Sequence, residues 1–133
     1  MKVLVTGVGG HLGHDVMNKL AKHGHEGIGT DILDRDKIAP PYVYRQLDIT
    51  NRDAVNCTLR ELSPDAVIHC AAWTAVDAAE EEANKAKVFS INVDGTRYIA
   101  KACKDIGSKI MYISTDYVFD GQGTEPWQPD CKD

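Results

Sequence analysis

Short apolar runs alternate along the chain with longer stretches in which apolar residues recur every three or four positions. The short runs predict β-strands, and the three-to-four spacing predicts amphipathic helices. The predicted strands are residues 2–6, 28–31, 42–47, 66–72 and 110–113. The predicted helices are residues 12–23, a helix that starts at Thr50–Asp53 and ends before Ser63, and a long helix over 88–106 that Gly107 closes.

Strands that alternate with helices predict a parallel sheet whose strands are joined by helical crossovers. The runs 66–72 and 110–113 are almost wholly apolar, which is typical of strands buried on both faces of such a sheet. The polar segment 32–41 ends in two prolines, and it holds a short helix or crosses over as a loop. The order of elements is therefore that of an α/β domain.

Composition narrows the class of protein. The chain has 133 residues, of which 43% are hydrophobic, so one domain with an apolar core is expected. Its net charge of −5 argues against a duplex nucleic acid as partner. No apolar stretch approaches the ~20 residues that span a bilayer, so no membrane association is expected. The first ten residues do not form a signal peptide, and a cytoplasmic location is expected.

A glycine-rich turn is predicted between the first strand and the first helix. Gly7, Gly10 and Gly13 are spaced as G-x-x-G-x-x-G. Glycines at such a junction permit a tight bend, close approach of a pyrophosphate to the backbone, and close packing of helix on strand. The pattern and its position predict a dinucleotide site. The alternative is a glycine-rich turn that binds nothing.

Acidic residues end the second and third predicted strands. Asp31 can accept the hydroxyls of a ribose and would repel a 2′-phosphate, although Arg35 and Lys37 follow and could pair with one. The choice between NAD and NADP stays open, as does a helix-capping or solvated role for Asp31. Asp48 and Ile49 could hold an adenine, or they lie at the N-terminal side of the following helix.

Five sequence blocks carry a family resemblance. They are Thr6–Gly13, Leu47–Thr50, Cys70–Asp77, Asn92–Gly95 and Ser114–Gly121. In this order they resemble the extended short-chain dehydrogenase/reductase superfamily, and within it the dTDP-4-dehydrorhamnose reductase family. The blocks A-A-W-T-A-V-D and S-T-D-Y-V-F are far more specific than the glycines. The resemblance covers essentially the whole chain and implies a Rossmann-like, doubly wound parallel sheet. It also implies reduction, by NADPH or NADH, of the C4 ketone of a dTDP-linked 6-deoxyhexulose to give dTDP-L-rhamnose.

The resemblance also implies roles for individual residues. The cofactor would be held by Gly7, Gly10, His11, Leu12, Gly13, Asp31, Asp48, Ile49, Ala71, Ala72 and Trp73. The substrate would be held by Thr74, Val76, Asp116 and Tyr117, and Thr115 matches the catalytic hydroxyl that hydrogen-bonds the reacting carbonyl. Asn92 would brace the active-site backbone, and His69 is expected to be a hydrogen-bonded core residue. Some family members use Mg²⁺ at a dimer interface, but no metal site is predicted here.

The proton donor of the family has no match in these residues. The family uses a Tyr-x-x-x-Lys helix, in which the Lys cation lowers the Tyr pKa. None of the five tyrosines is followed by Lys four positions later. We therefore expect residues 1–133 to be an incomplete domain, truncated after the fifth strand and without the substrate domain. Such a chain should be inactive, and its open strand edge should favour self-association.

Two other functions remain open at this point. One is a non-catalytic nucleotide-binding regulatory subunit, similar to the β subunit of methionine adenosyltransferase. The other is a different extended short-chain enzyme acting on a nucleotide-sugar, such as an epimerase. The T-A-V-D and S-T-D-Y-V-F blocks argue against that enzyme.

Overall fold

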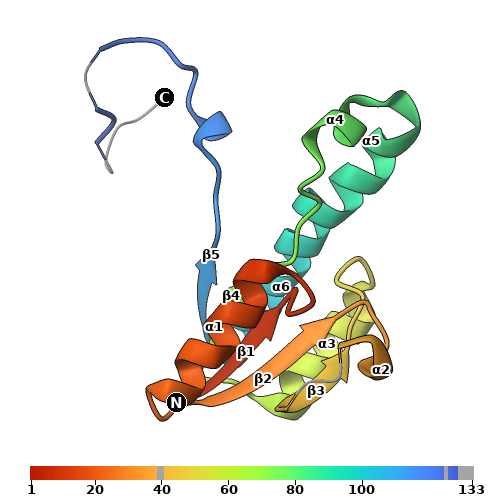
Figure 1. Ribbon diagram of the computed structural model, residues 1–133, viewed down its shortest axis with the longest axis vertical. Helices are drawn as coiled ribbons and strands as arrows, with labels where there is room; N and C mark the ends of the chain where they lie inside the picture. Colours follow the sequence, from red (N-terminus) through yellow and green to blue (C-terminus); the bar gives the residue numbers. More distant parts are fainter. Residues whose placement is uncertain (39–40, 125, 129–133) are drawn as a thin grey trace.

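The computed structural model describes residues 1–38, 41–124 and 126–128. Within them, five strands form one sheet in the order β3-β2-β1-β4-β5, and all neighbours are parallel (Figure 1). The strands are β1 Lys2–Thr6, β2 Glu26–Asp31, β3 Val43–Gln46, β4 Ala66–His69 and β5 Lys109–Tyr112. This order confirms the predicted Rossmann-like fold.

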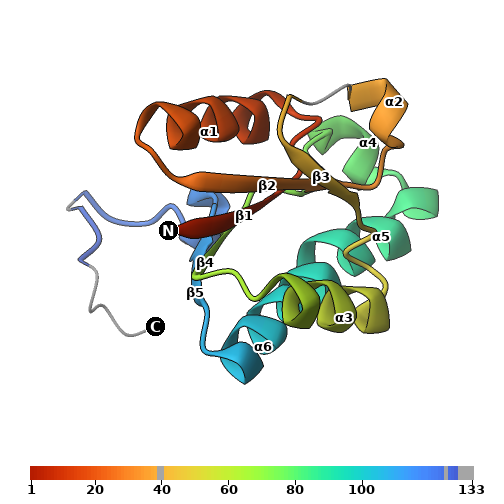
Figure 2. The same ribbon diagram turned by 90° about the horizontal axis from the view of Figure 1, so that it is seen from below.

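Helices cover both faces of the sheet. Figure 2 shows α1 on one face and α3 with α6 on the other. The helical elements are α1 His11–Lys22, α2 Arg35–Ile38, α3 Arg52–Leu62, α4 Val76–Glu80, α5 Glu82–Phe89, a π-helical turn η1 Ser90–Gly95, α6 Thr96–Ile106 and a short 3₁₀ turn η2 Asp116–Val118. The segment 32–41, for which a helix and a loop were both open, therefore contains a short helix. Among the described residues, no helix is long and apolar enough to cross a membrane.

The core has two halves because side chains alternate along β1. Leu4 points to the α3 and α6 side, where it is buried with Val67 and Ile99. Val3 and Val5 point to the α1 side, where Val5 is fully buried with Met17. The period of two in a central strand thus buries both of its faces, which accounts for the continuous apolar run in the sequence.

The start of α3 differs by one position from the prediction. Asn51, not Thr50, caps the helix, because its side-chain oxygen accepts the N–H of Ala54 at 3.0 Å. Thr50 instead donates its hydroxyl to Asp48 at 2.7 Å. The helix ends at Ser63, which has a left-handed backbone with φ 43°.

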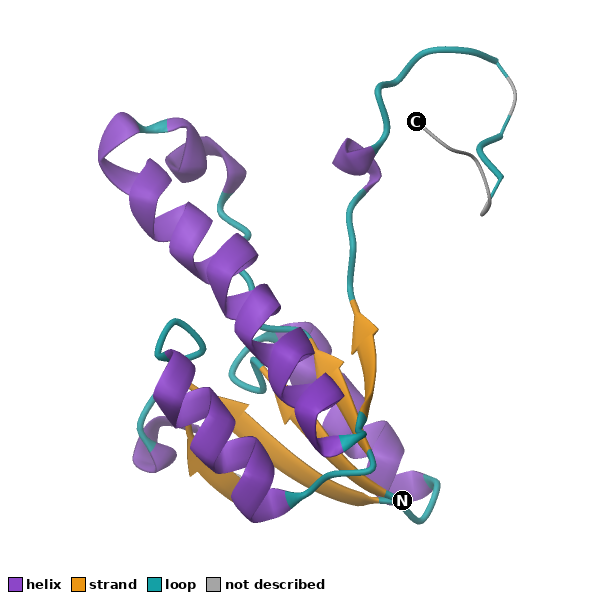
Figure 3. Cartoon of the chain, turned by 180° about the vertical axis from the view of Figure 1, so that it is seen from behind, coloured by secondary structure: helices purple, strands orange, loops and turns teal. Residues whose placement is uncertain are grey.

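The long helix predicted over residues 88–106 is not uniform. Residues 88 and 89 end α5, and η1 then forms a π-helical turn. The regular helix α6 follows and ends at Gly107, whose φ is 72°, as predicted. Three glutamates, residues 80–82, lie where α4 ends and α5 begins. Figure 3 shows α5, η1 and α6 as one long rod, which passes in front of the strands and extends beyond them.

The prediction of a buried fifth strand is wrong. Met111 and Tyr112 on β5 are 59% and 49% exposed. One edge of β5 pairs with β4, but the other edge has no partner strand among the described residues. In Figure 1 the described residues that follow β5 run away from the sheet, so they do not cover this edge. The expectation that β5 forms an open edge is thus confirmed for the described residues.

Candidate functional site

A cavity of about 740 Å³ lies at the carboxyl ends of the strands. Its wall includes the glycine turn, the ends of β2 and β3, the segments after β4 and β5, and η1. The predicted site residues on this wall are Gly7, Gly10, His11, Leu12, Gly13, Asp31, Asp48, Ile49, Ala71, Ala72, Trp73, Thr74, Val76, Thr115 and Tyr117. Asp116 does not line the cavity. The structure therefore brings together residues from five segments, and their roles in binding stay predictions.

Two glycines of the turn are required by close packing. Gly7 has φ +73°, and a Cβ on it would lie 2.7 Å from Cα and N of Ala71. A Cβ on Gly13 would lie 2.3 Å from the carbonyl oxygen of Gly7. Any side chain at these positions would push the turn away from β4 or α1 away from the turn. The predicted tight bend and close helix packing are both present.

Gly10 occupies a different environment. It is the N-cap of α1, and no side chain caps this helix. A Cβ on Gly10 would meet only the Gly7 carbonyl oxygen, at 3.4 Å. The first N–H groups of a helix lack intrahelical partners, and α1 carries no acidic residue in its first turn. The cavity is therefore bordered here by backbone donors with open space around Gly10, which suits an anion.

Asp31 connects the end of β2 to the glycine turn. One carboxylate oxygen accepts the N–H of Gly9 at 2.9 Å, and the other accepts the N–H of Leu33 at 3.2 Å. A carboxylate has about four acceptor positions, so these two bonds leave capacity for a ligand hydroxyl. The carboxylate therefore orders the turn and borders the cavity at the same time. Sequence reasoning found the second property but not the first.

Asp48 and Ile49 follow β3 and have separate surroundings. One oxygen of Asp48 accepts both the N–H and the hydroxyl of Thr50, at 2.9 and 2.7 Å, which makes a local turn before α3. Ile49 is 93% buried and packs against η1, where a Cβ on Gly95 would lie 2.7 Å from its Cδ1. Asp48 thus forms the turn on the N-terminal side of α3, and both residues line the cavity. A position beside that helix and a place on the cavity wall therefore do not exclude each other.

Asn92 braces the backbone after β4, as expected. Its side-chain oxygen accepts the Trp73 N–H at 2.8 Å, and its amide donates to the Trp73 carbonyl at 3.1 Å. The indole N–H of Trp73 donates to the Ala75 carbonyl at 3.0 Å, and the Lys87 ammonium lies 5.4 Å from the ring centre. Trp73 is thus held through both backbone and side chain.

His69 is buried at the end of β4, with 1% of its surface exposed. Its Nδ1 lies 2.7 Å from Thr6 Oγ1, and its Nε2 lies 3.1 Å from Thr96 Oγ1. Burial lowers the pKa of His69 to about 4, because desolvation disfavours the charged ring. The expectation of a hydrogen-bonded core histidine is confirmed. Sequence reasoning did not identify its partners, although Thr6 directly precedes the glycine turn.

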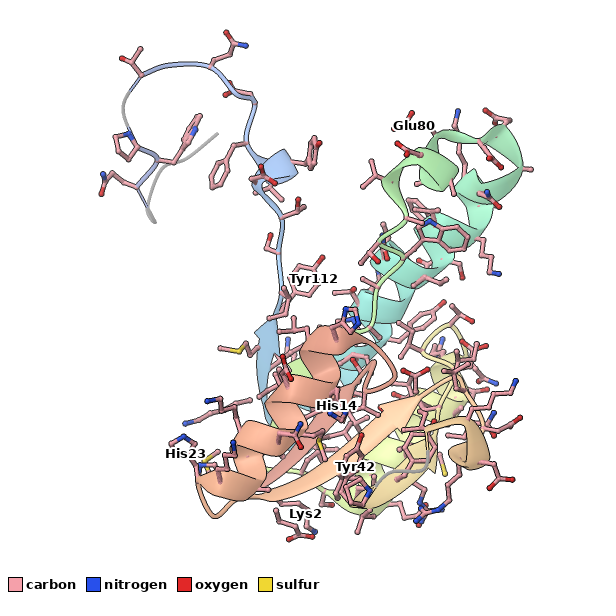
Figure 4. All side chains as sticks on the ribbon, viewed as in Figure 1. Lys2, His14, His23, Tyr42, Glu80 and Tyr112 are labelled. Atoms are coloured by element: carbon pink, nitrogen blue, oxygen red, sulfur yellow. The ribbon has the colours of Figure 1, made fainter. Side chains whose placement is uncertain are left out.

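Thr115 lies in the exposed segment after β5. Its hydroxyl donates to the Asp116 carboxylate at 3.2 Å and accepts the Tyr117 N–H at 3.3 Å. The hydroxyl must therefore turn away from Asp116 before it can donate to a carbonyl in the cavity. Tyr117, predicted to contact substrate, is 83% exposed. Figure 4 shows Tyr112, a wall residue that the sequence did not suggest, at the end of β5.

Comparison with known proteins identifies the family. The family model described as the RmlD substrate binding domain matches residues 1–132. The chain belongs to this family. A dTDP-4-dehydrorhamnose reductase of Streptomyces griseus is 40% identical over 128 residues, which cover 96% of this chain and 37% of that reductase. The chain therefore spans little more than a third of the length of this relative. The resemblance predicted from the sequence blocks is confirmed.

Solved structures agree with the fold. A Bacillus anthracis dTDP-4-dehydrorhamnose reductase in complex with NADP has a TM-score of 0.74 and 37% identity, over 92% of this chain and 40% of that one. A Stenotrophomonas maltophila UDP-glucose-4-epimerase with bound NAD and formylated UDP-arabinopyranose has a TM-score of 0.79 and 27% identity, over 96% of this chain and 40% of that one.

The environment of His69 predicts a specific dependence of stability on pH. The folded pKa of about 4 lies below the ordinary 6.5, so the unfolded chain binds the extra proton between these values. Stability should therefore fall as the pH falls from 6.5 to 4, by up to about 3 kcal/mol from this residue. Urea unfolding at pH 7 and pH 4.5 measures the loss.

His69→Gln is the matched variant, because it removes this titrating ring while the carboxylates and the other histidines still titrate. The wild-type protein should lose more stability on acidification than the variant does. Equal losses in the two proteins would contradict the buried neutral ring.

Proposed function

We propose that residues 1–133 form the NAD(P)-binding, Rossmann-like part of a reductase that acts on a dTDP-linked ketosugar. One observation carries the proposal: a single cavity is bordered by the uncapped N-terminus of α1 and by the predicted residues after β2, β3, β4 and β5. In doubly wound sheets, ligands bind at these carboxyl ends. Membership of the family and its named reductases support the same class of activity.

The residues present fit a dinucleotide. The open space at Gly10 and the first-turn N–H groups of α1 suit a pyrophosphate, and Asp31 has acceptor capacity for a ribose. Asp48 and Ile49 would border the adenine, and Ala71, Ala72 and Trp73 would border the nicotinamide. When bound, the dinucleotide supplies the hydride. The negative charge of Asp31 disfavours a 2′-phosphate, but Arg35 and Lys37 follow it closely, so we propose NADP or NAD without a preference.

The remaining chemistry is divided between these residues and others. Reduction of a ketone develops negative charge on its oxygen, and a hydroxyl at Thr115 can stabilise that charge once it releases Asp116. Thr74, Val76, Asp116 and Tyr117 would contact the sugar. The alkoxide also needs a proton, and no Tyr-x-x-x-Lys occurs in these 133 residues. These 133 residues therefore offer a hydroxyl for the carbonyl but not the Tyr-x-x-x-Lys proton donor that the family uses.

A pair of glycine variants tests the cofactor site. Gly10→Ala should fold with wild-type stability, since its Cβ meets one atom at 3.4 Å, but should weaken binding of NADH and NADPH about tenfold or more. Gly13→Ala should instead lower the free energy of unfolding by about 1–3 kcal/mol, because its Cβ meets backbone at 2.3 Å. Calorimetric titration and urea unfolding measure the two effects.

Wild-type protein that binds neither dinucleotide would contradict the proposed site in this chain. Equal affinity of the wild-type protein and Gly10→Ala would show that a dinucleotide binds elsewhere.

Purified residues 1–133 should not reduce dTDP-4-dehydrorhamnose above background, because the proton donor is missing. The measurement is NADPH and NADH oxidation at 340 nm with the sugar nucleotide present, and a complete reductase of the family serves as positive control. Turnover by this chain would show that the acid lies within it. A Tyr-x-x-x-Lys in the gene after codon 133 would favour the reductase over a regulatory subunit.

The exposed edge of β5 should cause self-association. Met111→Lys places a charge on this edge and should shift sedimentation at micromolar concentration toward the monomer. Val43→Lys is the matched control on the opposite edge strand, since Val43 and Met111 are 57% and 59% exposed. A wild-type monomer, or equal shifts in both variants, would contradict the role of β5.

A further inference from the structure

His69 lies at a junction that its burial alone does not explain. It is in register with Thr6 of β1 on one side and with Tyr112 of β5 on the other. Both ring nitrogens have hydroxyl partners, and the Tyr112 ring stacks on the imidazole with centroids 6.0 Å apart. An apolar residue could fill this space, but it would leave the buried Thr6 hydroxyl and the half-buried Thr96 hydroxyl without these partners.

One arrangement of the protons gives every donor in this group an acceptor. The hydroxyl of Thr96 donates to the carbonyl of Asn92 at 2.8 Å, so its oxygen accepts from His69 Nε2–H. A neutral ring protonated at Nε2 has an unprotonated Nδ1, which accepts the hydroxyl proton of Thr6. Thr6 Oγ1 in turn accepts the N–H of Ala71 at 3.1 Å. All hydrogen bonds therefore agree with one tautomer.

The two ends of this chain of hydrogen bonds hold the same segment. At one end Thr6 holds the N–H of Ala71. At the other end Asn92, whose carbonyl takes the Thr96 hydroxyl, holds both backbone groups of Trp73. Residues 71–73 line the cavity directly after β4. Loss of the hydrogen bonds of the His69 ring would therefore displace residues 71–73, which line the cavity beside His69.

We propose that His69, as the neutral Nε2–H tautomer, is the positioning residue that sets segment 71–73 against the cavity. Its ring accepts the hydroxyl proton of Thr6 and donates to the hydroxyl oxygen of Thr96, which ties β1 and the start of α6 to the end of β4. The consequence for ligand binding rests on the proposed function, because that function assigns segment 71–73 to the nicotinamide end of the cofactor. The arrangement of hydrogen bonds around His69 does not depend on the proposed function.

The test uses the 133-residue chain and two variants of Thr96. Thr96→Val keeps the shape and removes the hydroxyl, whereas Thr96→Ser keeps the hydroxyl. In Thr96→Val, hydrogen exchange at the Ala71 and Trp73 amides should accelerate about tenfold relative to the Leu4 and Val67 amides in the same sheet. Thr96→Ser should restore the wild-type pattern. Exchange at Ala71 and Trp73 that stays equal to wild type in Thr96→Val would overturn the proposal.

A spectroscopic measurement on the unaltered chain decides the tautomer. With ¹⁵N-labelled histidine, His69 should show one protonated and one unprotonated ring nitrogen at neutral pH, with the proton on Nε2. A proton on Nδ1, or a charged ring, would overturn the proposal even if the Thr96 variants do not fold.

Dinucleotide titration separates this inference from the proposed function. Thr96→Val should weaken NADH and NADPH binding about tenfold, and Thr96→Ser should bind within about twofold of wild type. If wild-type protein binds neither dinucleotide, the proposed function fails while the exchange and tautomer results still decide the role of His69. If wild-type and Thr96→Val bind equally well, the positioning role for the ligand is wrong.

Discussion

The parallel register of β1 with β2 and β4 places Thr6 level with Thr30 on one side and with His69 on the other. Pairing of β4 with β5 adds Tyr112 to the same row. Thr6, His69 and Tyr112 are the last residues of their strands. Because all strands point the same way, the segments that follow β1, β4 and β5 leave from a common level at the carboxyl ends of the strands. The cavity depends on that coincidence. A shift of β1 by one residue would reverse its two faces and separate His69 from Thr6.

Close backbone approach makes the register specific. Gly7 packs against the backbone of Ala71, and Gly13 packs against the backbone of Gly7. These contacts leave no room for a Cβ, so β1, α1 and the end of β4 have one mutual arrangement. In this arrangement, the polar groups at the carboxyl ends of the strands form hydrogen bonds with one another. Thr6 and His69 are buried, and Thr96 and Asn92 are half-buried. The hydrogen bonds among the four avoid the cost of buried unpaired groups.

The two sides of the cavity are held by different kinds of contact. On the side of β1 and β2, the Asp31 carboxylate and the packed glycines hold the turn through several bonds. On the side of β5, the hydrogen bonds of Thr115 among the described residues join it to its sequence neighbours Asp116, Tyr117 and Val118, and the strand before it is exposed. The groups assigned to the cofactor are therefore held by tertiary contacts, whereas those assigned to the reacting carbonyl are held locally.

The sequence by itself determined the order of elements, the parallel fold, the family and most of the cavity wall. Local periodicity shows strands and helices, and the glycine spacing together with block order places residues such as Gly10, Ile49 and Trp73 at the ends of successive strands. Only the tertiary structure decided that η1 is a π-helical turn, that β5 is exposed, and that Asp31 binds the glycine turn. It also decided that His69 joins Thr6 and Thr96, which are 63 and 27 residues away along the chain. Such contacts depend on register and on the depth of helix packing, and these are properties of the assembled sheet that no local pattern contains.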